Sequence, residues 1–136
     1  MPMPAAAPPL KRILQIDDDE DILAVGQAAL QGYGGFEVRI AQTGREALEM
    51  ARAFAPQLIL LDWMMPGMDG LATLRALQAE PATAGVPVVY LTAAVSPHLR
   101  EEALAAGAVE MLIKPFVPRQ LVAELNQIWA RCAAAG

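Results

Sequence analysis

The sequence is poor in the residues that build disulfides and Cys/His metal sites. Cys132 is the only cysteine and His98 the only histidine among 136 residues. One cysteine cannot form an internal disulfide, and the pair cannot supply the ligands of a zinc site. Disulfide-stapled secreted folds are therefore excluded, and the cysteine usage indicates a reducing, cytoplasmic location.

Positive charge and long apolar runs are also scarce. Ten Lys and Arg against fifteen Asp and Glu give a formal net charge of −5. Nucleic-acid-binding domains normally present a basic face, so we expect no direct contact with DNA or RNA. The longest uncharged stretch, Pro81–Leu99, contains three prolines and several polar residues, which predicts no membrane span. Met1–Pro9 lacks the basic start of a secretory signal.

Apolar residues, in contrast, are abundant enough to build a core. They make up 55% of the chain, against 18% charged residues, which excludes a disordered acidic polypeptide. The length suits one domain. We predict a flexible Pro/Ala tail over residues 1–9, a domain over residues 10–132 and a fraying helix end over residues 133–136.

Short apolar runs alternate with stretches of helical periodicity along the domain. The predicted strands are Ile13–Ile16, Phe36–Ile40, Leu58–Leu61, Pro87–Leu91 and Val109–Ile113. Helix start signals stand at Asp19, Thr43, Asp69, Ser96 and Pro118. In the first helix, expected to end at Gln31, the apolar spacing of Ile22, Val25 and Ala29 predicts the buried face. Strict alternation predicts an α/β fold with a doubly wound parallel sheet, whose ligand site lies at the carboxyl ends of the strands.

Polar residues follow four of the five predicted strands, namely Asp17, Asp18 and Asp19, then Asp62, Thr92 and Lys114. Taken singly, each has an ordinary explanation, since acidic residues cap helices and a lysine before a proline is usually solvated. Together at one sheet edge they indicate more. Clustered carboxylates repel one another, and Mg²⁺ relieves that repulsion. A carboxylate beside Mg²⁺, an ammonium and a hydroxyl can act as a nucleophile toward a phosphoryl group.

The motifs around these residues resemble the receiver domain of two-component response regulators, in particular the chemotaxis-regulator type. The stretches that carry the resemblance are Ile13–Asp19, Asp62–Gly70, Leu91–Ala93 and Lys114–Phe116. The resemblance covers about Leu10–Cys132. It implies a flavodoxin-like fold in which a five-stranded parallel sheet of order 2-1-3-4-5 carries five helices.

The resemblance implies an acceptor and a metal site. Asp62 would be the phosphoacceptor. Asp17 and Asp18, together with Asp62 and the backbone carbonyl of Met64, would hold Mg²⁺. The domain would not be an enzyme in the turnover sense, because it would only catalyse its own phosphorylation and slow dephosphorylation.

The resemblance also implies residues that stabilise the phosphoryl group. Lys114 would pair with its oxygens, Thr92 would donate a hydrogen bond to it, and the small Ala93 would leave it room. The Lys114–Pro115 bond would be cis.

The implied partners are proteins. A sensor histidine kinase or a histidine phosphotransfer protein would donate the phosphoryl group. The surface of the fourth helix, fifth strand and fifth helix would then switch toward a downstream protein target or an output domain. It could also support a phosphorylation-dependent homodimer.

Three positions depart from the family pattern. The family usually has Tyr or Phe three residues before the lysine, where this sequence has Met111. How this position couples to Thr92 without an aromatic ring is therefore an open question. Whether Tyr90 takes over that role is open as well. Met64 and Ala94 occupy positions that tune hydrolysis in this family. Neither side chain can hydrogen-bond the attacking water, which predicts a long-lived phosphorylated state.

Three other classes of protein compete with this interpretation. An aspartyl-phosphate phosphatase would need a second aspartate where Met64 stands. A flavin-binding protein would need a Ser/Thr/Gly-rich loop after the first strand, where aspartates stand. A binding module that is no longer phosphorylated remains the main alternative, although the complete set of acidic, hydroxyl and ammonium residues argues against it.

Overall fold

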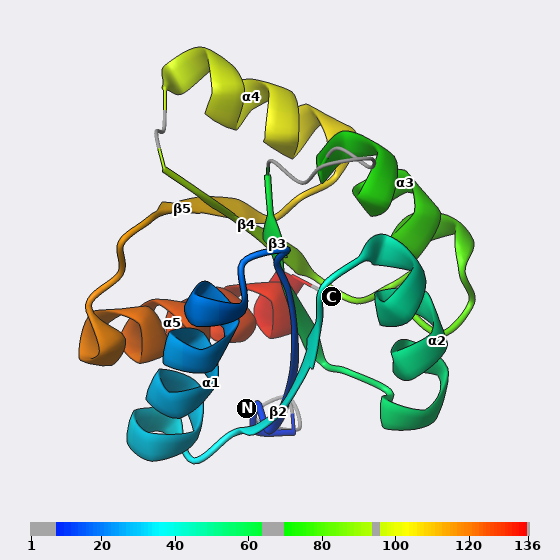
Figure 1. The fold of residues 1–136 in the computed structure, drawn as a ribbon. Coiled ribbons are helices and arrows are strands. Elements are labelled where there is room, and N and C mark those ends of the chain that lie inside the picture. Colours follow the sequence, from blue (N-terminus) through cyan, green and yellow to red (C-terminus); the bar gives the residue numbers. More distant parts are fainter. Residues whose placement is uncertain (1–7, 64–69, 94–95, 136) are drawn as a thin grey trace, which may run out of the picture.

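The structure is a computed structural model that describes residues 8–63, 70–93 and 96–135. Within them, strands and helices alternate strictly along the chain (Figure 1). The strands are β1 (Arg12–Ile16), β2 (Glu37–Ala41), β3 (Leu58–Asp62), β4 (Val88–Thr92) and β5 (Glu110–Ile113). The helices are α1 (Glu20–Gly34), α2 (Gly44–Phe54), α3 (Gly70–Ala79), α4 (Pro97–Ala106) and α5 (Pro118–Ala135).

The strands form one parallel sheet in the order β2-β1-β3-β4-β5, as predicted. The chain moves outward from β1 to β2, then returns past β1 to β3 and continues to the other edge. The strand order therefore reverses between β1 and β3, which leaves their carboxyl ends without a covering connection. Backbone pairing continues beyond these ends, because Asp17 N donates to Ala41 O at 3.1 Å and Trp63 N donates to Leu91 O at 3.0 Å.

Each face of the sheet carries its own core. Helices α2, α3 and α4 pack on one face, and α1 and α5 pack on the other (Figure 1). All five residues of β3 and all five of β4 are buried, as expected for central strands covered on both sides. The predicted stripe of α5 is confirmed, since Leu121, Leu125 and Ile128 are buried and Trp129 and Cys132 pack against the same core.

The predicted buried face of α1 was wrong in part. Ala29 is buried as predicted, but Ile22 is only half-buried and Val25 is 55% exposed. The other buried residues of the helix are Leu23, Gly26 and Leu30. The helix also continues past Gln31 to Gly34 and ends where Gly35 adopts a φ of 66°. The Gly35 N–H donates to carbonyls of the last turn, a closure that left-handed glycine provides at low cost. The apolar pattern was ambiguous because Leu23 and Leu30 lie one residue from the chosen spacing.

Most of the other boundaries lie within two residues of the prediction. Thr43 and Ser96 cap α2 and α4 as predicted, since their hydroxyls accept hydrogen bonds from Glu46 N and Leu99 N, each at 3.1 Å. The predicted cap Asp69 lies outside the described residues.

At the entry to the domain, Trp129 Nε1 donates to Pro8 O at 2.9 Å. Among the described helices, none has the length and apolar character needed to cross a membrane.

Candidate functional site

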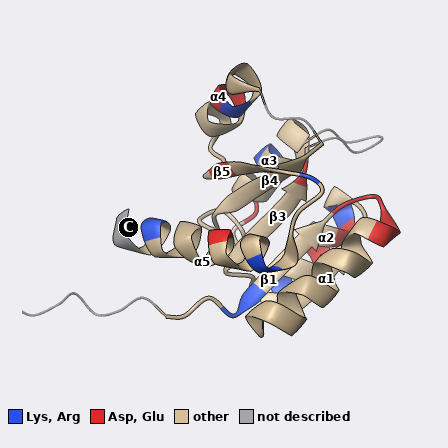
Figure 2. Cartoon of the chain, turned by 90° about the vertical axis from the view of Figure 1, so that its left-hand side faces the viewer, with Lys and Arg blue, Asp and Glu red and all other residues tan. Residues whose placement is uncertain are grey.

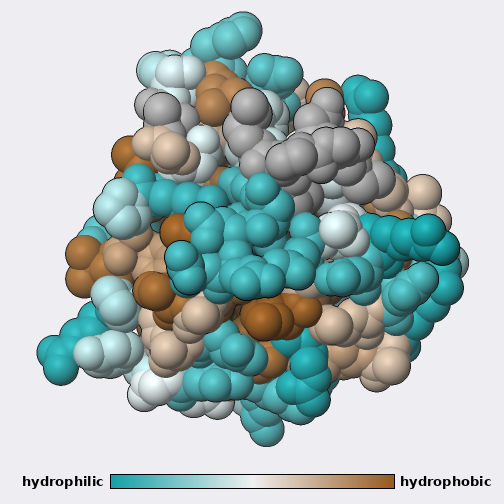
Figure 3. All heavy atoms as spheres, viewed as in Figure 1, coloured by the Kyte–Doolittle hydropathy of each residue, from teal (hydrophilic) through white to brown (hydrophobic). Residues whose placement is uncertain are grey.

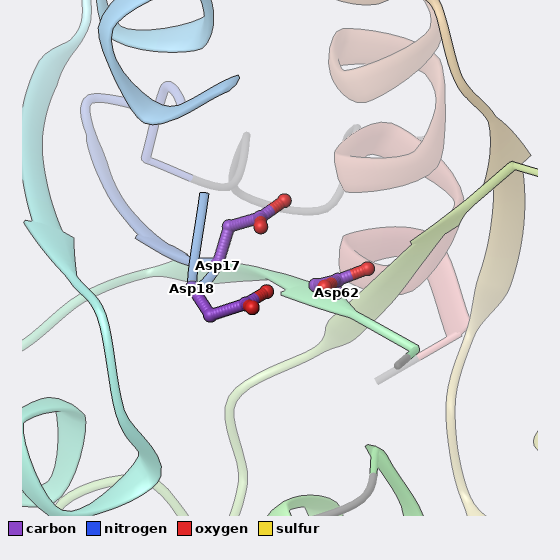
Figure 4. A group of neighbouring side chains, drawn as sticks. All are labelled: Asp17, Asp18 and Asp62. Atoms are coloured by element: carbon purple, nitrogen blue, oxygen red, sulfur yellow. The ribbon is translucent and has the colours of Figure 1, made fainter. Parts of the chain in front are cut away.

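Three carboxylates converge where β1 and β3 end. One oxygen each from Asp17, Asp18 and Asp62 lies within 4.8 Å of the other two. Figure 4 shows Asp17 and Asp18 leaving the end of β1 and Asp62 leaving the end of β3, with the three carboxylates on one side of the sheet edge. Asp17 and Asp62 are buried, whereas Asp18 is exposed to solvent. Two of the three carboxylates are thus buried in the protein, and that of Asp18 faces solvent.

Lys114 brings the end of β5 to this cluster. Its Nζ donates to Asp17 Oδ2 at 2.7 Å and to Asp62 Oδ1 at 3.0 Å. The lysine is placed by the backbone, because Lys114 N donates to Thr92 O at 2.7 Å beyond the last residue of β5. Burial lowers the pKa of Lys114, but the hydrogen bonds and negative charges of Asp17 and Asp62 outweigh burial, so the net pKa lies above its ordinary value. The side chain therefore remains a cation at neutral pH.

The three consecutive aspartates after β1 have different roles. Asp17 Oδ1 accepts a hydrogen bond from Asp19 N at 3.0 Å, so both of its carboxylate oxygens are held. Asp19 caps α1, because its Oδ1 accepts from Asp21 N and Ile22 N. The Asp18 carboxylate accepts no such hydrogen bond from the described residues. Of the three aspartates, Asp18 therefore has the carboxylate most available to a metal ion. Figure 2 shows the acidic residues gathered where the chain enters α1.

The charge of the cluster favours a divalent cation. Three carboxylates and one ammonium leave a formal charge of −2, which one divalent ion cancels. The ligand atoms are oxygens and few in number, which suits Mg²⁺, an ion that retains several waters and accepts substrate oxygens. The residues present therefore fit magnesium.

A hollow at the surface opens onto the carboxylates. It is lined by Asp17, Asp18, Asp19, Asp62, Trp63, Thr92, Ala93, Leu99 and Lys114. Figure 3, in the view of Figure 1, shows a hydrophilic band across the middle of this side of the molecule. Thr92 is 6% exposed and ends β4, while the small Ala93 is exposed beside it. The hollow is therefore lined by one hydroxyl and one ammonium together with the carboxylate of Asp62.

Other predicted site residues have different placements. Met111 is buried at 5% exposure in β5, next to Tyr90 in the strand register, so it is part of the core and does not line the hollow. The Lys114–Pro115 peptide bond is cis. Met64, with its expected carbonyl ligand, and Ala94 lie outside the described residues.

Comparison of the sequence and the fold with known proteins points to one family. The model of the response regulator receiver domain matches residues 13–126. This chain belongs to the response regulator receiver domain family. The fold agrees, since the chemotaxis protein CheY4 of Vibrio cholerae superposes with a TM-score of 0.81 at 33% identity, covering 88% of this chain and 98% of CheY4. A CheY-like receiver domain protein of Methanospirillum hungatei gives 0.78 at 31% identity, covering 93% and 99%.

The curated relatives are longer proteins. PrrA of Mycobacterium bovis, a transcriptional regulatory protein, is 42% identical over 120 residues, which are 88% of this chain and 50% of PrrA. The DNA-binding response regulator MtrA of Mycobacterium tuberculosis is 38% identical over 116 residues, which are 85% of this chain and 49% of MtrA. This receiver chain spans about half the length of those relatives. That it makes no contact with nucleic acid itself therefore stays a prediction.

Family membership establishes the general character of the chain. Receiver domains are signalling domains of two-component systems and not conventional enzymes, and the family binds Mg²⁺ through an acidic pocket of this kind. Phosphorylation of an aspartate is a general property of the family. Histidine kinases and output effectors are the general partners of response regulators.

One contact beside the site was missed by sequence reasoning. Tyr90 is fully buried in β4, and its hydroxyl donates to Gly70 O at 2.7 Å. Its ring packs edge-on against Trp63, with centroids 4.8 Å apart and planes at 80°. A tyrosine inside an otherwise aliphatic strand was the available signal, because a buried phenol usually has a hydrogen-bond partner.

Proposed function

We propose that Asp62 of this chain accepts a phosphoryl group from a phosphohistidine of a sensor histidine kinase or a histidine phosphotransfer protein. The observation that carries the proposal is the position of Lys114 Nζ, 2.7 Å from Asp17 and 3.0 Å from Asp62 in the lining of the same hollow. One ammonium is thus shared between a carboxylate of the metal cluster and the carboxylate that would be the nucleophile.

The reaction is a transfer of the phosphoryl group from nitrogen to oxygen. A carboxylate oxygen of Asp62 attacks phosphorus, the P–N bond of the phosphohistidine breaks, and its electron pair returns to the imidazole, which takes up a proton. The product is an acyl phosphate on Asp62. Asp17, Asp18, Asp62 and the carbonyl of Met64 would hold Mg²⁺, which when bound neutralises charge on the transferred group.

The residues of the hollow would then stabilise the product. Lys114 would pair with a phosphoryl oxygen, and the Thr92 hydroxyl would donate a hydrogen bond to another. Ala93 has no side chain beyond Cβ to obstruct entry. The movement of Thr92 and the end of β4 would bias the surface of α4, β5 and α5, with Met111 repacking as an apolar residue in place of the usual aromatic switch.

The signal would pass to a downstream protein target or to an output domain. The relatives named MtrA and PrrA are a DNA-binding response regulator and a transcriptional regulatory protein, so an output of that kind is one form the signal could take. We also propose that the α4, β5 and α5 surface can support a phosphorylation-dependent homodimer. We also propose that the protein is cytoplasmic, because the kinase domains that carry the phosphohistidine lie in that compartment.

Intact mass after incubation with Mg²⁺ and a small acyl phosphate tests the proposal. We expect a gain of about 80 Da, corresponding to one covalent phosphoryl group, only when Mg²⁺ is present. Asp62→Asn should abolish the gain, whereas Asp21→Asn, an exposed aspartate in the first turn of α1, should leave it unchanged. Without a mass gain from the small donor, a phosphohistidine protein is the next donor to use.

Failure with both donors would overturn the proposal. If Trp63 fluorescence also did not respond to Mg²⁺, the binding module that is no longer phosphorylated would be the better interpretation.

For the switching surface, amide hydrogen exchange of α4, β5 and α5 should change on phosphorylation. Unchanged exchange there would argue for another output face.

A further inference from the structure

Two side chains hold the segment that precedes β1. The indole Nε1 of Trp129 donates to Pro8 O at 2.9 Å, and the amide Nε2 of Gln57 donates to Pro9 O at 3.2 Å. Gln57 Oε1 in turn accepts a hydrogen bond from Lys11 N at 2.7 Å. A proline has no N–H, so its carbonyl is the backbone group that a receptor can bind. The domain thus carries hydrogen-bond donors placed for two successive proline carbonyls.

The same two side chains line a hollow of about 330 Å³, which we call the Trp129 hollow. Its lining consists of Gln57, Gly85, Val86, Pro87, Trp129, Cys132 and Ala133. Gln57 directly precedes β3 and Pro87 directly precedes β4, so the hollow lies at the end of the sheet opposite Asp62. A Cβ added to Gly85 would meet nothing within 4 Å, so the space beside this residue is open.

The residues ahead of Pro8 suit this surface in composition. Residues 1–7, outside the described part of the chain, have the sequence MPMPAAA and no charged side chain. The described residues that line the Trp129 hollow are also uncharged, so this segment would leave no side-chain charge desolvated there. Proline-rich segments dock on aromatic-lined grooves because their polyproline II form is ordered before binding. The Trp129 hollow offers an indole ring for such a contact.

The attachment at Pro8 brings the segment to the hollow. Residues 1–7 in polyproline II form would extend by roughly 22 Å, at about 3.1 Å per residue. A second hollow of about 380 Å³ adjoins the first, because Gly85, Val86, Pro87 and Cys132 line both. A segment tethered to a lining residue has an effective concentration on the order of millimolar. Docking therefore requires only a weak intrinsic affinity.

We propose that residues 1–7 of this chain dock in the Trp129 hollow and cover it within the same molecule. The occupant is this segment because Pro8, the residue that follows it, is already bonded to Trp129. The docked segment shields the thiol of Cys132 and ties the last turns of α5 to the start of β1. The inference differs from the flexible tail predicted over residues 1–9, and it does not depend on phosphorylation.

Amide order parameters of Met3 and Ala5 test the inference, measured by ¹⁵N relaxation on the full chain. A docked segment should give values near those of rigid backbone, about 0.85, whereas a flexible tail gives values below about 0.6. Both amides lie three or more residues from Pro8, so the hydrogen bond to Trp129 is not enough to order them.

Gly85→Leu should release the segment, because the leucine side chain fills the Trp129 hollow without a clash at its Cβ. The order parameters of Met3 and Ala5 should then fall below about 0.6. Gly32→Leu is the matched control. A Cβ at Gly32 also meets nothing within 4 Å, and Gly32 does not line the hollow, so this variant should leave both values unchanged.

Low order parameters in the wild type would overturn the inference and support the flexible tail. High values that survive in Gly85→Leu would also overturn it, because the segment would then be ordered at another place. Sedimentation at two protein concentrations tests the remaining occupant, a segment from a second copy of the chain. High values found only in a dimer would overturn docking within one molecule. None of these outcomes bears on phosphoryl acceptance by Asp62.

Discussion

Lys114 Nζ lies 3.0 Å from Asp62 Oδ1, although 52 residues separate the two in the chain. The contact exists because β3 and β5 run parallel on either side of β4 and end at the same edge of the sheet. It gives the ammonium two carboxylate partners, since Asp17 accepts its second hydrogen bond. Removing the lysine should therefore change the affinity of the cluster for a cation.

Lys114→Met should increase Mg²⁺ affinity and decrease phosphoryl acceptance. Without the ammonium the formal charge of the cluster goes from −2 to −3, which strengthens attraction of a divalent ion by about 1–2 kcal/mol, or on the order of tenfold. The transferred phosphoryl group meanwhile loses a cationic partner. Mg²⁺ titration of Trp63 fluorescence and intact mass measure the two effects. Weaker Mg²⁺ binding in the variant would contradict the charge argument.

Asp18→Asn and Asp17→Asn should differ in apo stability although both weaken Mg²⁺ binding. Asp18 is exposed, so its substitution should change the free energy of unfolding by no more than about 0.5 kcal/mol. Asp17 accepts hydrogen bonds from Asp19 N and Lys114 Nζ in a buried position, and its substitution should cost about 1–3 kcal/mol. Urea unfolding without Mg²⁺ makes the comparison, and equal losses would show that the buried contacts of Asp17 are not stabilising.

The phosphorylated state should be long-lived, and two substitutions should shorten it. Met64→Asn and Ala94→Glu each introduce a group that can hydrogen-bond the attacking water. Each should accelerate decay of the mass gain by up to about tenfold, the effect of one such bond. Ala28→Glu, at an exposed position of α1, serves as the control. No acceleration in either variant would refute a role for these two positions.

The effect of Gly26→Ala on the free energy of unfolding should change sign with the residue at position 15. Gln15 is 1% exposed, and its amide has no hydrogen-bond partner among the described residues. A Cβ at Gly26 would lie 2.4 Å from Gln15 Oε1, so Gly26→Ala should destabilise the wild type. With Gln15→Val, which should itself stabilise by roughly 1 kcal/mol, the helix propensity of alanine should add up to about 1 kcal/mol. A double-mutant cycle of urea unfolding measures the coupling, and additive effects would exclude the clash.

Glu110→Gln should destabilise the protein at neutral pH but not in acid. Burial raises the pKa of Glu110, but hydrogen bonds from Arg100 and Met111 N and the charge of Arg131 outweigh it and hold the net pKa below its ordinary value. A lowered folded pKa contributes stability that is present above the unfolded pKa and is lost as the pH falls through the folded value.

The difference between wild type and Glu110→Gln should therefore disappear in acid, below the ordinary glutamate pKa of about 4.3. Thermal unfolding at several pH values follows it. Glu101→Gln, at an exposed glutamate of α4, is the control. A difference that persists undiminished in acid would mean that packing, and not the charge of Glu110, stabilises this strand.

Local sequence determined the elements and the strand-end residues. The strand Leu58–Asp62 begins with a run of four apolar residues, and the Thr43 cap forms with a residue three positions on, so neither signal depends on distant parts of the chain. The sheet edge could be predicted as well, because parallel strands present their carboxyl ends together. Asp17, Asp62, Thr92 and Lys114 were identified for that reason.

The tertiary structure decided what depends on direction and proximity. Val25 was predicted to face the core, yet packing against the sheet and α5 selected Leu23 and Leu30, because two apolar stripes of α1 compete and spacing alone cannot choose between them. The bond from Tyr90 to Gly70 spans 20 residues and depends on how α3 sits on β4. Side-chain identity and order along the chain thus determined which groups gather at the sheet edge, whereas packing decided which of them touch, because contact distances follow from the placement of whole elements.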